Sequence, residues 1–311
     1  MKSLKLILTI VLAVVGISAM AQNINYDDPK YAAWGSNAEQ RKQNMLNNQF
    51  LKEAVDNKNY KAAAGYLKTL LEQSPKAAQG IYTNGIKLYK NLINRADSDE
   101  QRAMYIDSLM YVYDVRLQSF ANHAKYGKVY ILDRKAREYL TYKADDREGV
   151  AEAFEAAIAA QKEAGVVDPE VVAIYFKNLC DDYQNDIVDA MTIVNTYDAY
   201  AQYFDNIAPE QQEFKDQFEQ CFGLSGAASC ENLEAIFSKK VADNPEDAKL
   251  IEQAFKLMSR ANCSSDFFFS VGEKHYANKP SSDVAMLLAQ GFQNVKNFDK
   301  ANQYLREALA V

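Results

Sequence analysis

Few residues in this sequence could support catalysis or bind a metal. Its two histidines, His123 and His275, lie far apart in the chain, and neither has a neighbour at metal-ligand spacing. A metal site needs converging ligands, and nucleophilic catalysis needs a base beside its nucleophile. We interpret His123 as a polar loop residue and His275 as a residue at the end of a helix, so that surface or C-terminal helix positions account for both.

Adjacent acidic residues are the second candidate for chemistry. Asp145-Asp146 and Asp181-Asp182 would suit a glycosidase only if two acids faced each other across a cleft. Nothing in the sequence indicates that arrangement, and solvated helix ends account for both pairs. No glycine-rich phosphate-binding loop follows a strand. We therefore expect no catalytic residues, no metal or other cofactor, and no enzymatic activity.

The N-terminus has the organisation of a secretory signal peptide. Lys2 and Lys5 form a basic region, an apolar run extends from Leu6 to Ile17, and Ala19-Met20-Ala21 supplies small residues for cleavage. The apolar run is shorter than the roughly 20 residues of a membrane-spanning helix, and no cysteine follows it for lipid attachment. We expect residues 1–21 to be removed, and the mature protein to be periplasmic, exposed on the cell surface or secreted, without a lipid anchor.

The four cysteines can form disulfides if the chain is exported, because disulfides persist outside the cytosol. Cys230 starts one expected helix and Cys263 follows the end of the next, and antiparallel packing brings these ends together. We predict a Cys230–Cys263 disulfide, which would contribute roughly 3–4 kcal/mol on the chain-entropy model. Cys221 is an alternative partner for Cys230, across a glycine-containing turn. Cys180 is interpreted as a buried small side chain, and the absence of a Cys-x-x-Cys motif gives no support for a redox enzyme.

Charge excludes some classes of partner. The chain has 35 basic and 42 acidic residues, and loss of Lys2 and Lys5 with the signal peptide would bring the net charge to −9. An acidic chain without a basic cluster cannot hold a phosphate backbone electrostatically. We therefore expect no nucleic-acid partner, no anionic membrane surface, and no membrane insertion after cleavage.

The elements that would position these residues are helices. Asp28-Pro29, Asp168-Pro169 and Asn244-Pro245 each combine an N-cap acceptor with proline at the first helical position. Pro75 and Pro280 follow helical runs. No segment shows a sustained apolar–polar alternation, so the sequence predicts an all-α protein.

One short motif occurs twice. Asn59-Tyr60-Lys61-Ala62-Ala63 recurs as Asn297-Phe298-Asp299-Lys300-Ala301, with apolar residues four and seven positions after each final alanine. Pro245 and Pro280 are 35 residues apart, close to the 34-residue period of tetratricopeptide repeats (TPRs). The spacing resembles the TPR consensus, in which small residues let two antiparallel helices approach closely.

The whole pattern predicts about seven TPR-like helix hairpins that stack into a right-handed α-solenoid, with degenerate central hairpins. Val150, Phe154, Ala157 and Ile158 keep the inner face of one central hairpin. We expect residues 22–36 to be a linker and residues 37–311 to be the repeat domain. The expected helix pairs are 37–57 with 59–73, 77–95 with 99–120, 126–143 with 147–163, 169–184 with 187–206, 209–222 with 230–242, 246–261 with 264–277, and 282–295 with 298–311.

Three segments also resemble a family of exported bacterial TPR proteins with no assigned activity: Asp107–Arg116, Ser225–Cys230 and Arg260–Asp266. Members of that family continue with further repeats, whereas this sequence stops at Val311. Leu305, Leu309 and Val311 would then lie on a helix face with no following helix. We expect either that the chain is a fragment, which we favour, or that this face meets a partner or a second copy.

The TPR consensus places ligand-binding residues on the first helix of each hairpin. Carried over to this sequence, it indicates a concave-face site for a protein or peptide in the cell envelope. These residues lack the lysine and asparagine pattern of a carboxylate clamp, so we do not expect recognition of a C-terminal carboxylate. The predicted binding residues are Asn48, Lys52 and Asp56 in the first hairpin, and Met286, Gln290 and Asn294 in the last.

The 20 tyrosines leave an alternative open. Aromatic rings with polar tips suit helix–helix seams, and they also suit peptide or glycan surfaces. The alternative function is therefore a glycan-binding accessory protein that uses exposed tyrosines. The sequence indicates neither the identity of the partner nor the pathway or oligomeric state.

Overall fold

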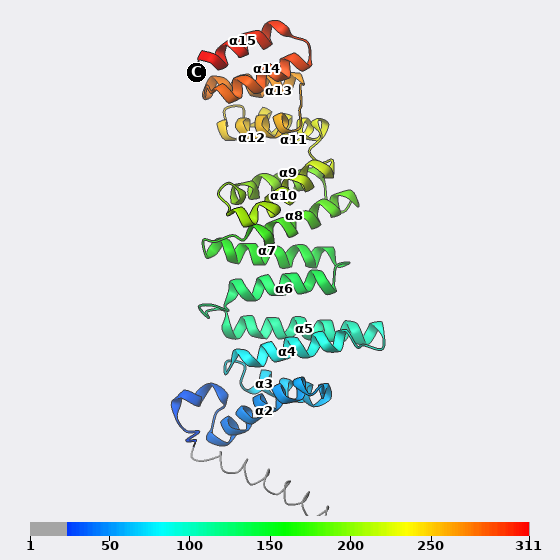
Figure 1. Ribbon diagram of the computed structural model, residues 1–311, viewed down its shortest axis with the longest axis vertical. Helices are drawn as coiled ribbons and strands as arrows, with labels where there is room; N and C mark the ends of the chain where they lie inside the picture. The colour runs from blue at the N-terminus through cyan, green and yellow to red at the C-terminus, as the bar shows by residue number, and fades with distance from the viewer. Residues whose placement is uncertain (1–23, 311) are drawn as a thin grey trace, which may run out of the picture. The chain divides into compact units, whose positions relative to one another are not determined.

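The computed structural model describes residues 24–310, and within them the chain is helical without strands (Figure 1). The predicted signal peptide, residues 1–21, lies outside the described residues, as does Val311. The chain divides into two compact units, with the boundary between Tyr142 and Lys143. The expected all-α class is thus confirmed, and the two units are described separately below.

The first unit contains a short 3-10 helix and five α-helices. Helices α2 and α3 form one antiparallel hairpin, α4 and α5 form the next, and α6 packs on α5. The elements are η1 (Pro29–Trp34), α2 (Ala38–Asp56), α3 (Tyr60–Gln73), α4 (Gln79–Ile93), α5 (Asp99–Phe120) and α6 (Lys128–Tyr142).

The second unit contains the remaining elements. Helices α12 and α13 form one hairpin, and α14 and α15 form another. The elements are α7 (Arg147–Glu163), α8 (Pro169–Gln184), α9 (Ala190–Ala201), η2 (Gln202–Phe204), η3 (Pro209–Gln211), α10 (Gln212–Ser225), α11 (Cys230–Asp243), α12 (Ala248–Arg260), α13 (Asp266–Asn278), α14 (Ser282–Asn294) and α15 (Phe298–Ala310).

The predicted helices all occur close to their expected bounds, but one predicted pairing differs from the observed packing. Helix α10 packs mainly on α8, and α11 packs on α12, so residues 209–222 and 230–242 are not the two halves of one hairpin. The segments 126–143 and 147–163 fall in different units, so their pairing stays a prediction. Aromatic side chains of α8 and α10 pack together and hold the two helices in contact. The periodicity of each helix does not predict this contact between distant segments.

Two of the three predicted helix starts are confirmed. The side chain of Asp28 accepts a hydrogen bond from the backbone N–H of Lys30, and Asp168 does the same for Glu170. Asn244 instead ends α11. Asp247 caps α12 by accepting hydrogen bonds from two backbone N–H groups, so the helix starts later than the Asn244-Pro245 motif predicts.

A single type of turn joins several consecutive helices. At Lys58, Asn262 and Lys296 the backbone is left-handed, with φ of 61°, 54° and 60°. The N–H of the following residue then bonds to the carbonyl five residues earlier, as in Asn59 N–H to Ala54 O at 2.8 Å. This is the Schellman arrangement, which satisfies the last carbonyls of a helix and reverses the chain. The repeated Asn-aromatic motif therefore marks a repeated turn.

The core of the first unit follows the predicted small-residue pattern. Ala63, Leu67 and Leu70 are buried and pack with residues of α2 and α4 such as Leu51 and Leu88. Part of the expected linker also contacts this core, because Trp34 packs against it. The Asn44 side chain donates a hydrogen bond to the Trp34 carbonyl at 2.8 Å. The segment before α2 is therefore folded onto the first hairpin.

The core of the second unit is rich in aromatic rings. Phe176 of α8, Tyr197 of α9, Phe204 of η2, and Phe218 and Phe222 of α10 form one cluster of buried rings. The predicted inner face of α7 is confirmed, and small residues are buried where α14 and α15 meet. The buried residues of these two groups are Val150, Phe154, Ala157, Ile158, Ala285, Ala289, Ala301 and Ala308.

Candidate functional site

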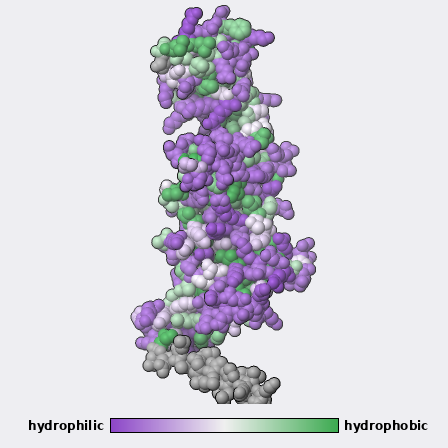
Figure 2. Space-filling view, viewed as in Figure 1, coloured by the Kyte–Doolittle hydropathy of each residue, from purple (hydrophilic) through white to green (hydrophobic). Residues whose placement is uncertain are grey.

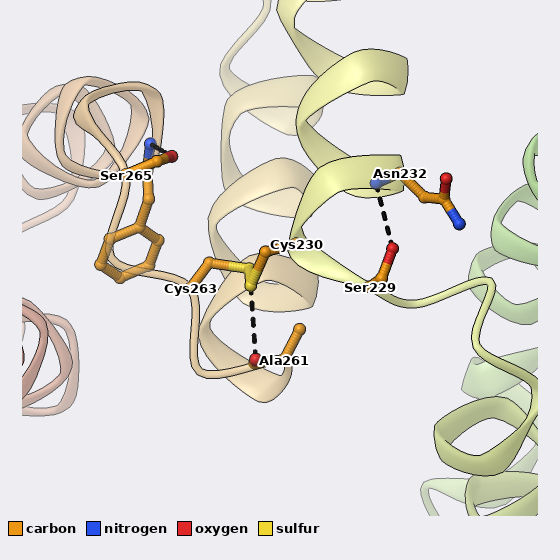
Figure 3. The surroundings of a disulfide bond; sticks show 7 residues. Ser229, Cys230, Asn232, Ala261, Cys263 and Ser265 are labelled. Atoms are coloured by element: carbon orange, nitrogen blue, oxygen red, sulfur yellow. Dashed lines mark hydrogen bonds between the residues drawn. A yellow bond between two sulfur atoms is a disulfide. The ribbon is translucent and has the colours of Figure 1, made fainter.

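A disulfide bond in the second unit links the start of α11 to the turn after α12 (Figure 3). The sulfur atoms of Cys230 and Cys263 are paired, and their Cα atoms are 5.4 Å apart. Cys230 is the first residue of α11, where the Ser229 hydroxyl accepts a hydrogen bond from the Asn232 N–H at 3.2 Å. Cys263 follows the left-handed Asn262 in the turn after α12. The structure thus contains the predicted pairing, and Cys221 is not the partner of Cys230.

In the first unit, the predicted residues of α2 lie beside α4. The Asp56 carboxylate pairs with Lys87 of α4 at 2.8 Å and with Lys52 at 3.8 Å. The hydrogen bond from Lys87 and its positive charge hold the pKa of Asp56 below its ordinary value. Asn48 is half-buried, and its Oδ1 has no hydrogen-bond partner in the described part of the chain. The charged side chains of this surface, Lys52, Asp56 and Lys87, therefore pair with one another.

In the second unit, the predicted residues of α14 lie beside α12. Met286 is 50% exposed and Leu287 is 38% exposed. Gln290 and Asn294 line a small pocket of about 20 Å³, which has room for about one water molecule. We call this surface the α12–α14 face; its residues are Ser259, Asn262, Met286, Leu287, Gln290 and Asn294.

The α12–α14 face combines apolar contact area with amide groups. Gln290, Asn294 and Asn262 each offer both donors and acceptors. The buried Oγ of Ser259 has no hydrogen-bond partner among the described residues, and Ser259 also lines the pocket. The pocket cannot enclose a ligand, but the face can accept a polar side chain or a backbone amide while an apolar group covers Met286.

The first unit also contains a larger groove, which was not predicted from the sequence. It has a volume of about 380 Å³ between α3, α4 and α5. Tyr111, which is 57% exposed, and Tyr89 contribute aromatic rings, and Gly65 leaves space on α3. The lining residues are Ala64, Gly65, Leu67, Lys68, Leu71, Glu72, Tyr89 and Tyr111. The sequence signals for this groove were a glycine within a helix, Gly65, and a tyrosine, Tyr111.

A charged hollow of about 420 Å³ is present between α9 and α12. Asp198 and Glu252 contribute carboxylates to it, and Lys249 and Lys256 contribute ammonium groups. Burial raises the pKa of Asp198, and the nearby Lys240 and Lys256 oppose that shift. The hollow therefore presents both positive and negative charges, and its lining does not favour a ligand of one charge.

The histidines and acidic pairs have structural positions that partly differ from expectation. His275 lies in the last turn of α13, as expected, but it is buried beside Phe255, with 5.7 Å between ring centroids. Asp146 caps α7 as expected of a helix end. Asp182 is buried and pairs with Arg147 at 3.3 Å, so it is not a solvated residue. Among residues 24–310, no three His, Cys, Asp or Glu side chains are grouped so that they could hold a metal ion.

Most tyrosines pack between helices. Tyr82, Tyr113, Tyr175 and Tyr197 are buried, whereas Tyr111 is largely exposed. The face shown in Figure 2 is mostly hydrophilic, with apolar residues scattered among polar ones. In the described part of the chain, no helix combines the length and the apolar character needed to cross a membrane.

No family model matches the chain, and no curated protein matches it. Among solved structures, it is similar to the crystal structure of a tetratricopeptide repeat protein from Parabacteroides merdae ATCC 43184, with 15% identity and a TM-score of 0.35. The match covers 86% of this chain and 93% of that chain.

The fold is evident from the chain's own geometry. Left-handed turns join the antiparallel helices of several hairpins, and alanines are buried where α2 meets α3 and where α14 meets α15. Residues 24–310 therefore form an all-helical chain that contains tetratricopeptide-like hairpins.

Proposed function

We propose that this protein is an exported, non-enzymatic scaffold of the cell envelope that binds a protein or peptide through the α12–α14 face. The observation that carries this proposal is the presence of exposed Met286 and Leu287 beside the amides of Gln290 and Asn294. Exposed apolar side chains surrounded by polar groups are typical of interaction sites. Methionine adapts its shape to different apolar partners.

The face of α2 and α4 is a weaker candidate for the same function. A charged ligand there would have to replace the ion pairs of Asp56 with Lys52 and Lys87. Exposed ion pairs of this kind contribute little to stability, so a ligand can replace them, but they offer little specificity. Asn48, Lys52 and Asp56 thus remain a proposed secondary contact.

Site-specific photo-cross-linking tests the scaffold proposal. A photoreactive amino acid at Gln290 of the exported full chain should cross-link in intact cells to a defined protein partner. The same residue at Asn302, exposed on α15, is the matched control and should give no such product. Leu287→Asp should abolish the cross-link while the melting temperature stays within a few degrees. Identical products from both positions, or none from Gln290, would contradict the proposal.

Export is tested separately from binding. N-terminal sequencing of the protein recovered from an envelope fraction should start at Gln22. A chain that retains residues 1–21 and fractionates with the cytosol would contradict the predicted export without bearing on the binding face.

Glycan binding is a second candidate, favoured by the groove with Tyr89 and Tyr111. Tyrosine rings can stack on the apolar faces of sugar rings. A glycan array should then give hits that calorimetry reproduces and that Tyr111→Ala abolishes. An array without hits for the folded protein would remove this candidate.

Self-association through α15 is a further proposed interaction. Leu309 is 90% exposed, which leaves an apolar side chain in water. Sedimentation velocity should show a concentration-dependent dimer that Leu309→Asp converts to monomer. If the wild-type protein is a monomer over the full concentration range, self-association through α15 is contradicted.

A further inference from the structure

Helices α8 and α10 lie side by side over several turns. The Phe176 ring is 4.5 Å from the Phe218 ring and 6.4 Å from the Phe222 ring, between centroids. Further along both helices, the Gln184 side chain donates a hydrogen bond to the Leu224 carbonyl at 3.5 Å. These contacts fix the register, in which the two helices run in the same direction.

The two remaining cysteines lie between these contacts. Cys180 is four residues after Phe176 and four before Gln184, so it is on the stripe of α8 that faces α10. Cys221 is three residues after Phe218 and three before Leu224, which places it on the facing stripe of α10. Both therefore fall in the same layer of the interface. Cys180 is only 4% exposed, and Cys221 is half-buried.

The electrostatic surroundings of the two thiols agree with this placement. Burial raises the pKa of Cys180 to about 12, and the Cys221 thiol is the next contributor to that shift. Burial also raises the pKa of Cys221. Lys177 and Asp181, which pair with each other at 2.7 Å, act on both thiols, the lysine lowering and the aspartate raising their pKa values. The two thiols thus share one environment.

We propose that Cys180 and Cys221 are a second dithiol–disulfide pair, which closes by exchange with a disulfide oxidant and links α8 to α10. The Cys230–Cys263 bond, which links α11 to the end of α12, is separate from it. Neither Cys180 nor Cys221 is disulfide-bonded in the structure.

The exchange has a defined order. Because Cys221 is the more exposed thiol, its thiolate attacks one sulfur of the oxidant, whose disulfide bond breaks and releases one thiolate. The Cys180 thiolate then attacks the Cys221 sulfur of the mixed disulfide. The Cys180–Cys221 bond forms, and the second thiol of the oxidant leaves. Two protein thiols are oxidised, one oxidant disulfide is reduced to two thiols, and the two protons pass to the released thiolates or to water.

The raised pKa values predict a slow reaction at neutral pH, because only the thiolate is nucleophilic. Below both pKa values, the thiolate fraction and hence the rate of a given step rise about tenfold per pH unit. The reaction should therefore be much faster at pH 8.5 than at pH 7.

Mass spectrometry of the mature chain tests the proposal. The folded protein is treated with oxidised glutathione at pH 8.5, quenched with acid, alkylated and digested. We expect a Cys180–Cys221 cross-linked peptide and no loss of the Cys230–Cys263 peptide. A cross-linked peptide found before any treatment would equally support the pair. A stable glutathione adduct on Cys221, or two thiols that stay unmodified, would overturn it.

Two variants separate the steps. Cys180→Ala should stop at a glutathione adduct on Cys221, because no second thiol resolves it. Cys221→Ala should stay unmodified, because Cys180 is buried. Circular dichroism checks that each variant folds, and the wild-type result decides the proposal even if one does not. An adduct on Cys180 in either wild type or Cys221→Ala would contradict the proposed order.

Discussion

The rings of Tyr197 and Phe222 stack with their centroids 3.8 Å apart and their planes at 11°. The Tyr197 hydroxyl donates a hydrogen bond to Glu219 at 2.6 Å and accepts one from Arg260. Burial is the main cause that raises the pKa of Tyr197, so the hydroxyl keeps its proton and remains a donor. One residue of α9 thus joins the aromatic core to a charged pair from α10 and α12.

This relationship predicts different costs for removing the ring and the hydroxyl. Tyr197→Ala should lower the free energy of unfolding by about 3–5 kcal/mol, because it leaves a cavity beside three aromatic rings. Tyr197→Phe keeps the stack and should cost about 1–3 kcal/mol, since Glu219 and Arg260 lose a partner. Urea unfolding of both variants measures the difference. Equal losses would show that the ring contributes little beyond its hydroxyl.

The Cys230–Cys263 disulfide should stabilise the second unit. Cys230 and Cys263 are separated by 33 residues, and the chain-entropy model gives about 3–4 kcal/mol for a loop of that length. The double variant Cys230→Ser, Cys263→Ser should unfold at correspondingly lower denaturant concentration. The matched control is Cys180→Ser, Cys221→Ser, which also removes two thiols. It is compared with wild type in which Cys180 and Cys221 are thiols and the Cys230–Cys263 bond is intact. This control should not lose the stability that the closed loop contributes.

Stability should depend on pH through His275. Burial lowers the pKa of His275 below its ordinary value of about 6.5, so below that value the unfolded chain binds a proton that the folded chain does not. The free energy of unfolding should be highest above about pH 6.5. It should fall as pH drops toward the folded pKa, by up to ~1.4 kcal/mol per pH unit. His275→Gln should have a flatter profile between pH 5.5 and 7, and an unchanged slope would rule His275 out as its cause.

Two glycines predict opposite effects of the same substitution. A Cβ at Gly272 of α13 would lie 2.6 Å from Phe255 Cε2 and 2.7 Å from Leu288 Cδ2, so Gly272→Ala should cost about 1–3 kcal/mol. A Cβ at Gly65 of α3 would meet nothing within 4 Å. Gly65→Ala should therefore stabilise the protein by about 0.5–1 kcal/mol, since alanine favours the helix. Thermal unfolding of both variants checks the two signs.

The helices were predictable because their signals are local. Asn59 and Asp168 mark helix starts by capping, and the Asn59–Ala63 motif located a hairpin whose small residue, Ala63, is fully buried. The disulfide was predictable for the same reason, since Cys230 and Cys263 lie at the ends of consecutive antiparallel helices. Each of these inferences needs only the spacing of residues within two consecutive helices.

The rest depends on contacts between distant segments. The packing of α10 on α8 arises from Phe176 and Phe218, whose attraction no periodicity within either helix encodes. The buried positions of His275 and Asp182 likewise depend on which helices cover them. The groove beside Tyr111 is created by the separation of α3 and α5, and neither helix alone indicates it. Gln290 and Asn294 were named from a repeat register, and only the packed α12 shows what they line.

The left-handed turns leave room for protein engineering. Lys58, Asp186 and Lys296 hold φ near 60° although none of them is glycine, and all three side chains are exposed. A left-handed backbone costs a residue with a Cβ about 1–2 kcal/mol, which glycine largely avoids. Glycine at these three positions should therefore raise the thermal stability of the chain without changing any buried side chain.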